Sequence, residues 1–144
     1  MRRHTERGQA TVEMVVVLML LILLVFGAFE FAQGMMLKHA LDVGTEKAAR
    51  LLAINPGDYA TAEDTVCGEV DAIALGAGYG AQTTVRLYDA DTWSQIAPAD
   101  LAAAPFGYRF LVGAELTWQP RVPFMTLSDT FIAAAHHGVV DRIP

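Results

Sequence analysis

Cysteine, serine and positive charge are scarce in this chain of 144 residues. Cys67 is the single cysteine, so no disulfide can form within the chain, and the thiol is either buried and apolar or reactive. We favour the buried thiol because unpaired cysteine is among the most buried residue types. The serines, Ser94 and Ser128, lie in no recognisable catalytic motif. Beyond a short N-terminal arm the sequence has no basic stripe, which argues against nucleic-acid binding.

The motifs of metal, phosphate and redox chemistry are absent as well. The sequence contains no HExxH, CxxC or Walker pattern. His136 and His137 are adjacent, so a strand would direct them to opposite faces and prevent them from sharing one metal ion. Asp89 and Asp91 resemble a fragment of a calcium loop, but its other ligand positions are missing. We therefore expect a protein that is not an enzyme and needs no metal or cofactor.

Residues 14–29 contain no charged side chain, and no proline occurs before Pro56. With its flanks, this apolar run exceeds the roughly 20 residues that cross a hydrocarbon core of about 30 Å. Hydrophobic residues make up 53% of the chain and the mean hydropathy is +0.34, and the excess lies mostly in the first third. We expect one membrane-spanning helix, in contact with lipid.

Three arginines, Arg2, Arg3 and Arg7, precede the apolar run, and few basic residues follow it closely. The positive-inside rule therefore predicts a cytoplasmic N-terminus. The rest of the chain would lie outside the inner (cytoplasmic) membrane, in the periplasm or beyond the cell. A cleaved secretory signal fits less well, because the run is long and is followed by no small-residue cleavage site.

The helical pattern continues past the membrane, since apolar residues recur at helical spacing as far as Ile54. One helix over residues 9–54 would be on the order of 70 Å long. The sequence therefore predicts a retained transmembrane helix that extends out of the membrane as a stalk.

A glycine and an acid mark the start of this helix. Gly8 ends the basic arm, and Glu13 is the fifth residue counted from Gln9. This spacing resembles the type IV prepilin site, at which a membrane peptidase cuts after the glycine. The resemblance implies that residues 1–8 form a leader whose removal, with three arginines and one glutamate, changes the formal net charge from -6 to -8.

Glu13 is unusual because an ionised residue within lipid is costly and normally finds a partner. It lies one helical turn after Gln9, on the same face. It could accept hydrogen bonds from the terminal amine of a neighbouring subunit and so set the axial register of packed helices. The alternative is that Glu13 is simply solvated at the headgroup level.

Residues 7–53 resemble the TadE family, the pseudopilins of the tight-adherence (Tad, or Flp) pilus system. The resemblance lies in the segments "RGQATVE", "FGAFEFAQG" and "ALDVGTEKAARLLA". The proline often found inside that family's apolar run is absent here, which favours a straighter helix. The resemblance implies a minor pilin for pilus assembly, adherence or secretion. Its partners would be a prepilin peptidase, the major pilin, other minor pilins, an assembly ATPase and an inner-membrane assembly platform.

Four residues near the outer end of the span are candidate helix-packing contacts: Gly27, Glu30, Phe31 and Gly34. The glycines would permit close approach, although their spacing is not GxxxG. An acid at the water interface is more often solvated, and we favour that interpretation for Glu30.

Residues 55–144 predict an exported α+β domain. The word "NPGD" at residues 55–58 ends the long helix, a second helix follows from Tyr59 to Ile73, and the glycines of residues 76–80 stop it. Apolar residues then alternate in "TTVRLYD" and "YRFLVGAELTW", which predicts strands. The segment between them is expected to be a long loop or short helix.

The pattern of residues 126–140 fits either a strand or a helix, and the family resemblance implies a strand. We thus expect an antiparallel sheet of about three strands, with the outer half of the long helix as one wall of the core. The competing functional interpretation is a single-pass membrane-anchored periplasmic domain that binds a ligand or partner and never enters a filament.

Overall fold

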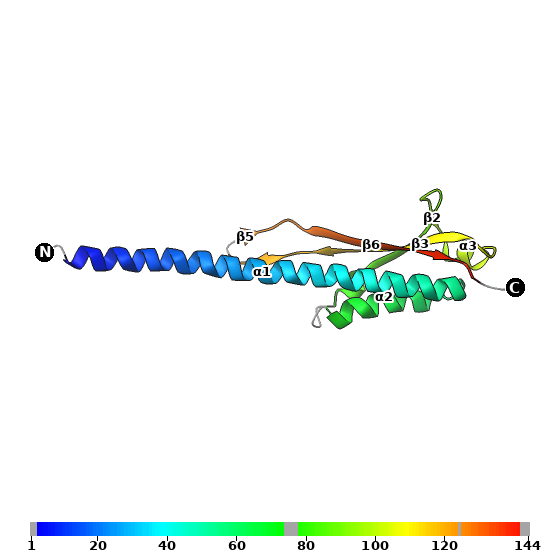
Figure 1. The fold of residues 1–144 in the computed structure, drawn as a ribbon, viewed down its shortest axis with the longest axis horizontal. Coiled ribbons are helices and arrows are strands. Elements are labelled where there is room, and N and C mark those ends of the chain that lie inside the picture. The colour runs from blue at the N-terminus through cyan, green and yellow to red at the C-terminus, as the bar shows by residue number, and fades with distance from the viewer. Residues whose placement is uncertain (1–2, 74–77, 124, 142–144) are drawn as a thin grey trace.

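A computed structural model describes residues 3–73, 78–123 and 125–141, with the backbone alone described for residues 3–9 and 126. One long helix carries a small α+β domain on its C-terminal half (Figure 1). The elements in chain order are α1 (Arg3–Ile54), α2 (Tyr59–Ile73), the 3-10 helix η1 (Gly80–Gln82), β1 (Thr84–Asp89), β2 (Gln95–Ile96), α3 (Pro98–Ala102), β3 (Arg109–Trp118), β4 (Arg121–Val122), β5 (Met125–Thr126) and β6 (Thr130–Val139). The predicted α+β class is confirmed.

Helix α1 has 52 residues and would measure about 78 Å at the usual helical rise. It begins at Arg3, so residues 3–8 of the predicted leader continue the helix at its N-terminal end. Gly8 does not interrupt the helix, because a single glycine costs only about 1 kcal/mol. The helix ends as predicted at Ile54, before Pro56.

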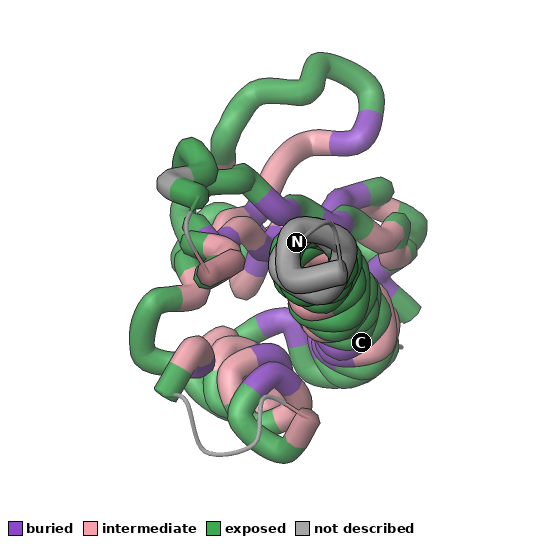
Figure 2. The backbone as a smooth tube through the Cα atoms, turned by 90° about the vertical axis from the view of Figure 1, so that its left-hand side faces the viewer, coloured by how far each residue is buried: buried purple, intermediate pink, exposed green. Residues whose placement is uncertain are grey.

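The two halves of α1 have different surroundings. Most side chains of residues 10–36 are exposed, whereas the inward side of the following turns is completely buried at Leu37, Ala40, Leu41, Ala48 and Leu52. Figure 2, which looks along the molecule from its N-terminal end, shows exposed turns of α1 behind the grey end and buried segments around its far part. The outer half of α1 is therefore a wall of the domain core.

Helix α2 packs on α1 through its buried residues Ala62, Val66 and Val70. A Cβ placed on Gly44 would lie 3.0 Å from the Cα of Val66, so this glycine permits the close approach of the two backbones. The hydroxyl of Tyr59 donates a hydrogen bond of 2.8 Å to the carbonyl of Val85 and joins α2 to the sheet. The glycines expected to stop α2 lie partly outside the described residues.

The main sheet is antiparallel and has the strand order β2-β1-β3-β6. Both predicted alternating strands are confirmed, and the C-terminal segment is a strand, as the family resemblance implied. The fourth strand, β2, lies in the segment expected to be a loop or short helix, as does α3. A second sheet, β4 with β5, extends from the end of the domain that is nearer the N-terminus of α1 (Figure 1).

The face of the sheet that carries the even-numbered residues of β3 is turned toward the core. Phe110, Val112, Ala114, Leu116 and Trp118 are all buried, as their spacing predicted. On the edge strand β6, Ile132 and Ala134 belong to the same core, while Phe131 remains 63% exposed. The sheet is thus covered by helix on this face.

Candidate functional site

The apolar stretch of α1 is the most distinctive surface of the chain. Within the described residues, α1 is the one helix long and apolar enough to cross a membrane. Its most apolar stretch of 18 residues has a mean hydropathy of 2.9, and none of this stretch is buried. An unburied surface of this kind requires lipid or another apolar partner. The N-terminal half of α1 is therefore a candidate membrane anchor.

The predicted cleavage bond between Gly8 and Gln9 lies within the helical backbone of α1. Glu13 follows one turn later, and its side chain is exposed. Among the described residues, no hydrogen bond or ion pair engages the Glu13 carboxylate. This carboxylate is thus available to a group from outside the chain, and its role stays a prediction.

Gly27 and Glu30 lie where α1 leaves its purely apolar part. A Cβ placed on Gly27 would meet nothing within 4 Å, so Gly27 remains open to an approaching neighbour. Glu30 lines a polar pocket of about 440 Å³ together with Gln33 and Arg121. Glu30 therefore borders a polar recess.

The space beside Gly34 is filled by another residue of the same chain. A Cβ placed there would lie 2.7 Å from Cζ3 of Trp118, so the indole ring lies directly against the helix backbone. Sequence patterns could not identify this contact, because the two residues belong to separate elements. The close approach at Gly34 fixes the end of β3 onto α1.

Phe31 lines an apolar groove of about 540 Å³ that sequence analysis did not find. We call this feature the basal groove. Its lining residues are Phe31, Gly34, Met35, Lys38, Trp118, Thr130, Phe131, Ile132 and Ala133. They come from α1, β3 and β6, which are far apart in sequence, so no local sequence pattern marks the groove.

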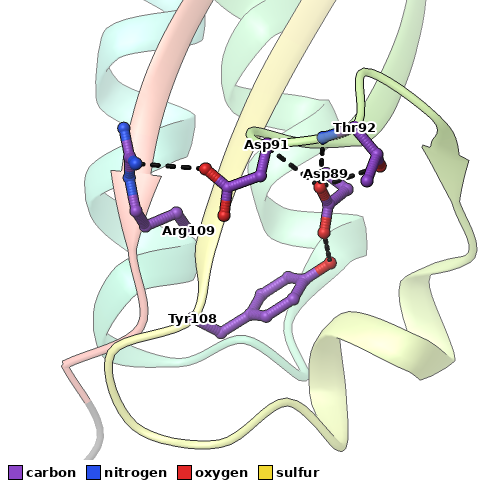
Figure 3. A network of polar contacts seen from close by, with 5 residues as sticks. All are labelled: Asp89, Asp91, Thr92, Tyr108 and Arg109. Atoms are coloured by element: carbon purple, nitrogen blue, oxygen red, sulfur yellow. Dashed lines mark hydrogen bonds and ion pairs between the residues drawn. The ribbon is translucent and has the colours of Figure 1, made fainter.

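At the opposite end of the domain, a polar network holds the turn after β1 (Figure 3). The Tyr108 hydroxyl donates a hydrogen bond of 2.6 Å to Asp89, whose other carboxylate oxygen accepts hydrogen bonds from the backbone amides of Asp91 and Thr92. The Tyr108 bond, followed by those from Thr92, lowers the pKa of Asp89 to about 2. The Asp89 bond raises the pKa of Tyr108 to about 12.

This network is structural in character. Asp89 is already bonded to neighbouring donors, and Arg109 forms an ion pair of 3.1 Å with Asp91. In the described part of the chain, no three His, Cys, Asp or Glu side chains come together as a metal site. The resemblance of "DAD" to a calcium loop is thus explained by a turn that bonds internally.

Cys67 is half-buried, whereas we favoured a buried thiol over a reactive one. It follows Val66 on α2 and is rotated away from the face that packs on α1. Burial raises the pKa of its thiol, and nearby Glu63 and Asp64 add to that rise. The thiolate form is therefore disfavoured, which makes Cys67 a poor nucleophile.

The two histidines lie on opposite faces of β6, as predicted. His136 is opposite the buried Val112 and is half-buried, whereas His137 is exposed. Their directions prevent them from binding one metal ion together.

The comparison with known families finds a similarity at the N-terminal end of the chain. Residues 8–50 match the family model described as TadE-like protein. No curated protein and no solved structure matches the chain. The match starts at the predicted cleavage glycine, covers most of α1 and ends before α2 and the sheet. Residues 8–50 are therefore similar to the TadE-like family, which confirms the resemblance found in the sequence.

Proposed function

We propose that the chain is a minor pilin, or pseudopilin, of a Tad-type pilus system and acts as a structural protein. The observation that carries this proposal is the segment similar to the TadE-like family, which begins with Gly8, Gln9 and Glu13 and continues into an exposed apolar helix. A prepilin peptidase would cut after Gly8. The mature helix would then pack beside the helices of the major pilin and other minor pilins.

Glu13 is the proposed register residue in this packing. Cleavage creates an α-amino cation at Gln9, and the Glu13 carboxylate is free of partners among the described residues. An amine and a carboxylate in a low-dielectric setting attract each other more strongly than in water. Pairing between neighbouring subunits would therefore fix their stagger along the helix axis.

The proposed location follows from charge and anchoring. Arg2, Arg3 and Arg7 would keep the N-terminus in the cytoplasm, and the α+β domain would lie outside the inner membrane. From there the inner-membrane assembly platform could draw the subunit into a filament. Because the outer half of α1 is a wall of the core, the domain would move together with its anchor.

A substitution at Glu13 tests this proposal in cells that make the pilus. Glu13→Ala should leave the amount of membrane-bound protein unchanged and strongly reduce the number of pili per cell, because the register contact is lost. Glu30→Ala is the matched control, since Glu30 borders a polar recess, and should leave piliation near normal. Normal piliation with Glu13→Ala would contradict the proposal and favour a membrane-anchored domain that never enters a filament.

A further inference from the structure

We propose that the basal groove binds an acyl chain of a membrane phospholipid, so that the base of the domain forms a second contact with the bilayer. This inference rests on the membrane-anchored state of the proposed function, but it does not depend on cleavage or pilus assembly.

The walls of the groove are apolar and are not covered by the rest of the described chain. Phe31, Met35 and Phe131 are 69%, 61% and 63% exposed. The indole of Trp118 forms the inner wall, where it lies on Gly34. So many large apolar side chains around one recess are costly in water and indicate an apolar partner.

The position of the groove along α1 identifies that partner. About 20 helical residues cross the hydrocarbon core. If the span begins between Ala10 and Met14, it ends between Phe29 and Gln33. The groove opens at Phe31 and Met35, at or within a turn of that boundary, and Figure 1 shows the start of β6 on this side of the domain. The basal groove is thus continuous with the lipid-facing surface of α1.

Lys38 supplies a charge suited to a phospholipid. It lines the groove one turn beyond Gly34, on the side away from the membrane. Its ammonium forms an ion pair of 2.6 Å with Asp42, yet an ammonium has three donors and can also bond a lipid phosphate.

The modest volume of the groove favours an extended chain over a neighbouring helix. An α-helix with its side chains is about 10–12 Å across, so a single turn occupies roughly 500 Å³. The groove, at about 540 Å³, could enclose hardly more than one such turn. A flexible acyl chain can instead lie along the groove and fill it.

The chain carries its own pair of probes, because Trp118 and Trp93 are its two tryptophans. Trp118 lines the groove, whereas Trp93 is 66% exposed in the turn after β1, at the far end of the domain. The full chain with Trp93→Phe or with Trp118→Phe would be reconstituted in phosphatidylcholine vesicles, either plain or with brominated acyl chains. Bromine quenches an indole only at close approach. Trp118 should lose emission in brominated vesicles, and Trp93 should not.

Groove variants separate lipid entry from simple proximity to the membrane. In the Trp93→Phe background, Phe131→Ser should weaken the quenching of Trp118, and Phe106→Ser, an exposed residue at the far end, should not. Lys38→Gln should also weaken it. Lys47→Gln is its matched control, because Lys47 pairs with Glu69 away from the groove, and it should have no effect.

Three results would overturn the inference. Equal Trp118 emission in plain and brominated vesicles, with the protein still bound to them, would exclude lipid in the groove and leave the membrane anchor intact. Quenching that disappears as the protein-to-lipid ratio rises would indicate that a second copy of the chain occupies the groove. A chain that does not float with the vesicles would contradict membrane anchoring itself, and with it both proposals.

Discussion

Gly27 and Gly34 are two glycines of the same helix with different surroundings. Trp118 lies against Gly34, whereas a side chain at Gly27 would meet nothing within 4 Å. We predict that Gly34→Ala destabilises the domain by about 1–3 kcal/mol, because the added methyl group overpacks a close contact. Gly27→Ala should leave the stability of the domain unchanged. Urea unfolding of the detergent-solubilised chain, followed by tryptophan fluorescence, measures both.

Equal unfolding midpoints for the two glycine variants would show that the indole can move aside at little cost. That result would remove the close contact at Gly34 as the reason for the fixed position of the end of β3.

The Asp89–Tyr108 pair predicts a pH dependence of stability. The pKa of Asp89 falls to about 2 in the folded chain, below its ordinary value of 3.8, so the unfolded state binds more protons between these values. The stability that Asp89 contributes is present above pH 4 and is lost as the pH falls toward 2. The pKa of Tyr108 rises from 10.0 to about 12, so its contribution is present below pH 10 and is lost as the pH rises toward 12.

Tyr108→Phe tests this linkage, since it removes the hydroxyl and keeps the ring. The variant should be less stable at neutral pH, and its stability should change less steeply in both pH windows. Urea titrations at several pH values give the slopes. Slopes identical to those of the parent chain would show that the hydrogen bond does not couple the two groups.

At the scale of elements, α1 passes from an exposed apolar half into a half that is packed in the domain core. Leu41 is completely buried in the domain core, and Leu24 is 72% exposed on the apolar half. Leu41→Ala should destabilise the domain by about 2–5 kcal/mol because it leaves a cavity. Leu24→Ala, the same chemical change on the same helix, should leave unfolding of the domain in detergent nearly unchanged. A similar loss from both substitutions would contradict the division of α1 into anchor and core wall.

The regular elements could be predicted because their sequences carry a period. Apolar residues at intervals of three and four predicted α2, and alternating apolar residues predicted β1 and β3. In β3 the even-numbered residues are buried, as the alternation requires. The strands β2, β4 and β5 have two residues each, too few to show any period. The prediction of β6 as a strand depended on the family resemblance, because the segment "FIAAA" fits a helix as well.

The site was only partly predictable for the same physical reason. The spacing of Gly8, Gln9 and Glu13 is local along one helix, so the sequence contains it directly. The basal groove joins Phe31 to Phe131 across a hundred residues, and its shape depends on the sheet register. The predicted helix was bounded at Gln9 by the expected cleavage after Gly8, and in the uncleaved chain α1 extends back to Arg3.

For the whole molecule, the absence of a break between anchor and domain matters most. No proline interrupts α1, and its buried face from Leu37 to Leu52 is shared with α2 and the sheet. Axial movement of the anchor would thus carry the α+β domain with it. A subunit of this form suits extraction from a membrane into a helical assembly, which is the central claim of the proposed function.

The most direct test of that claim is the intact mass of the protein isolated from membranes, with and without the cognate prepilin peptidase. The account predicts that the peptidase removes residues 1–8, leaving a chain that begins at Gln9 and has a formal net charge of -8 instead of -6. Without the peptidase the full 144 residues should remain. An uncut chain in both samples would contradict the account, because no terminal amine would then exist at Gln9 to pair with Glu13.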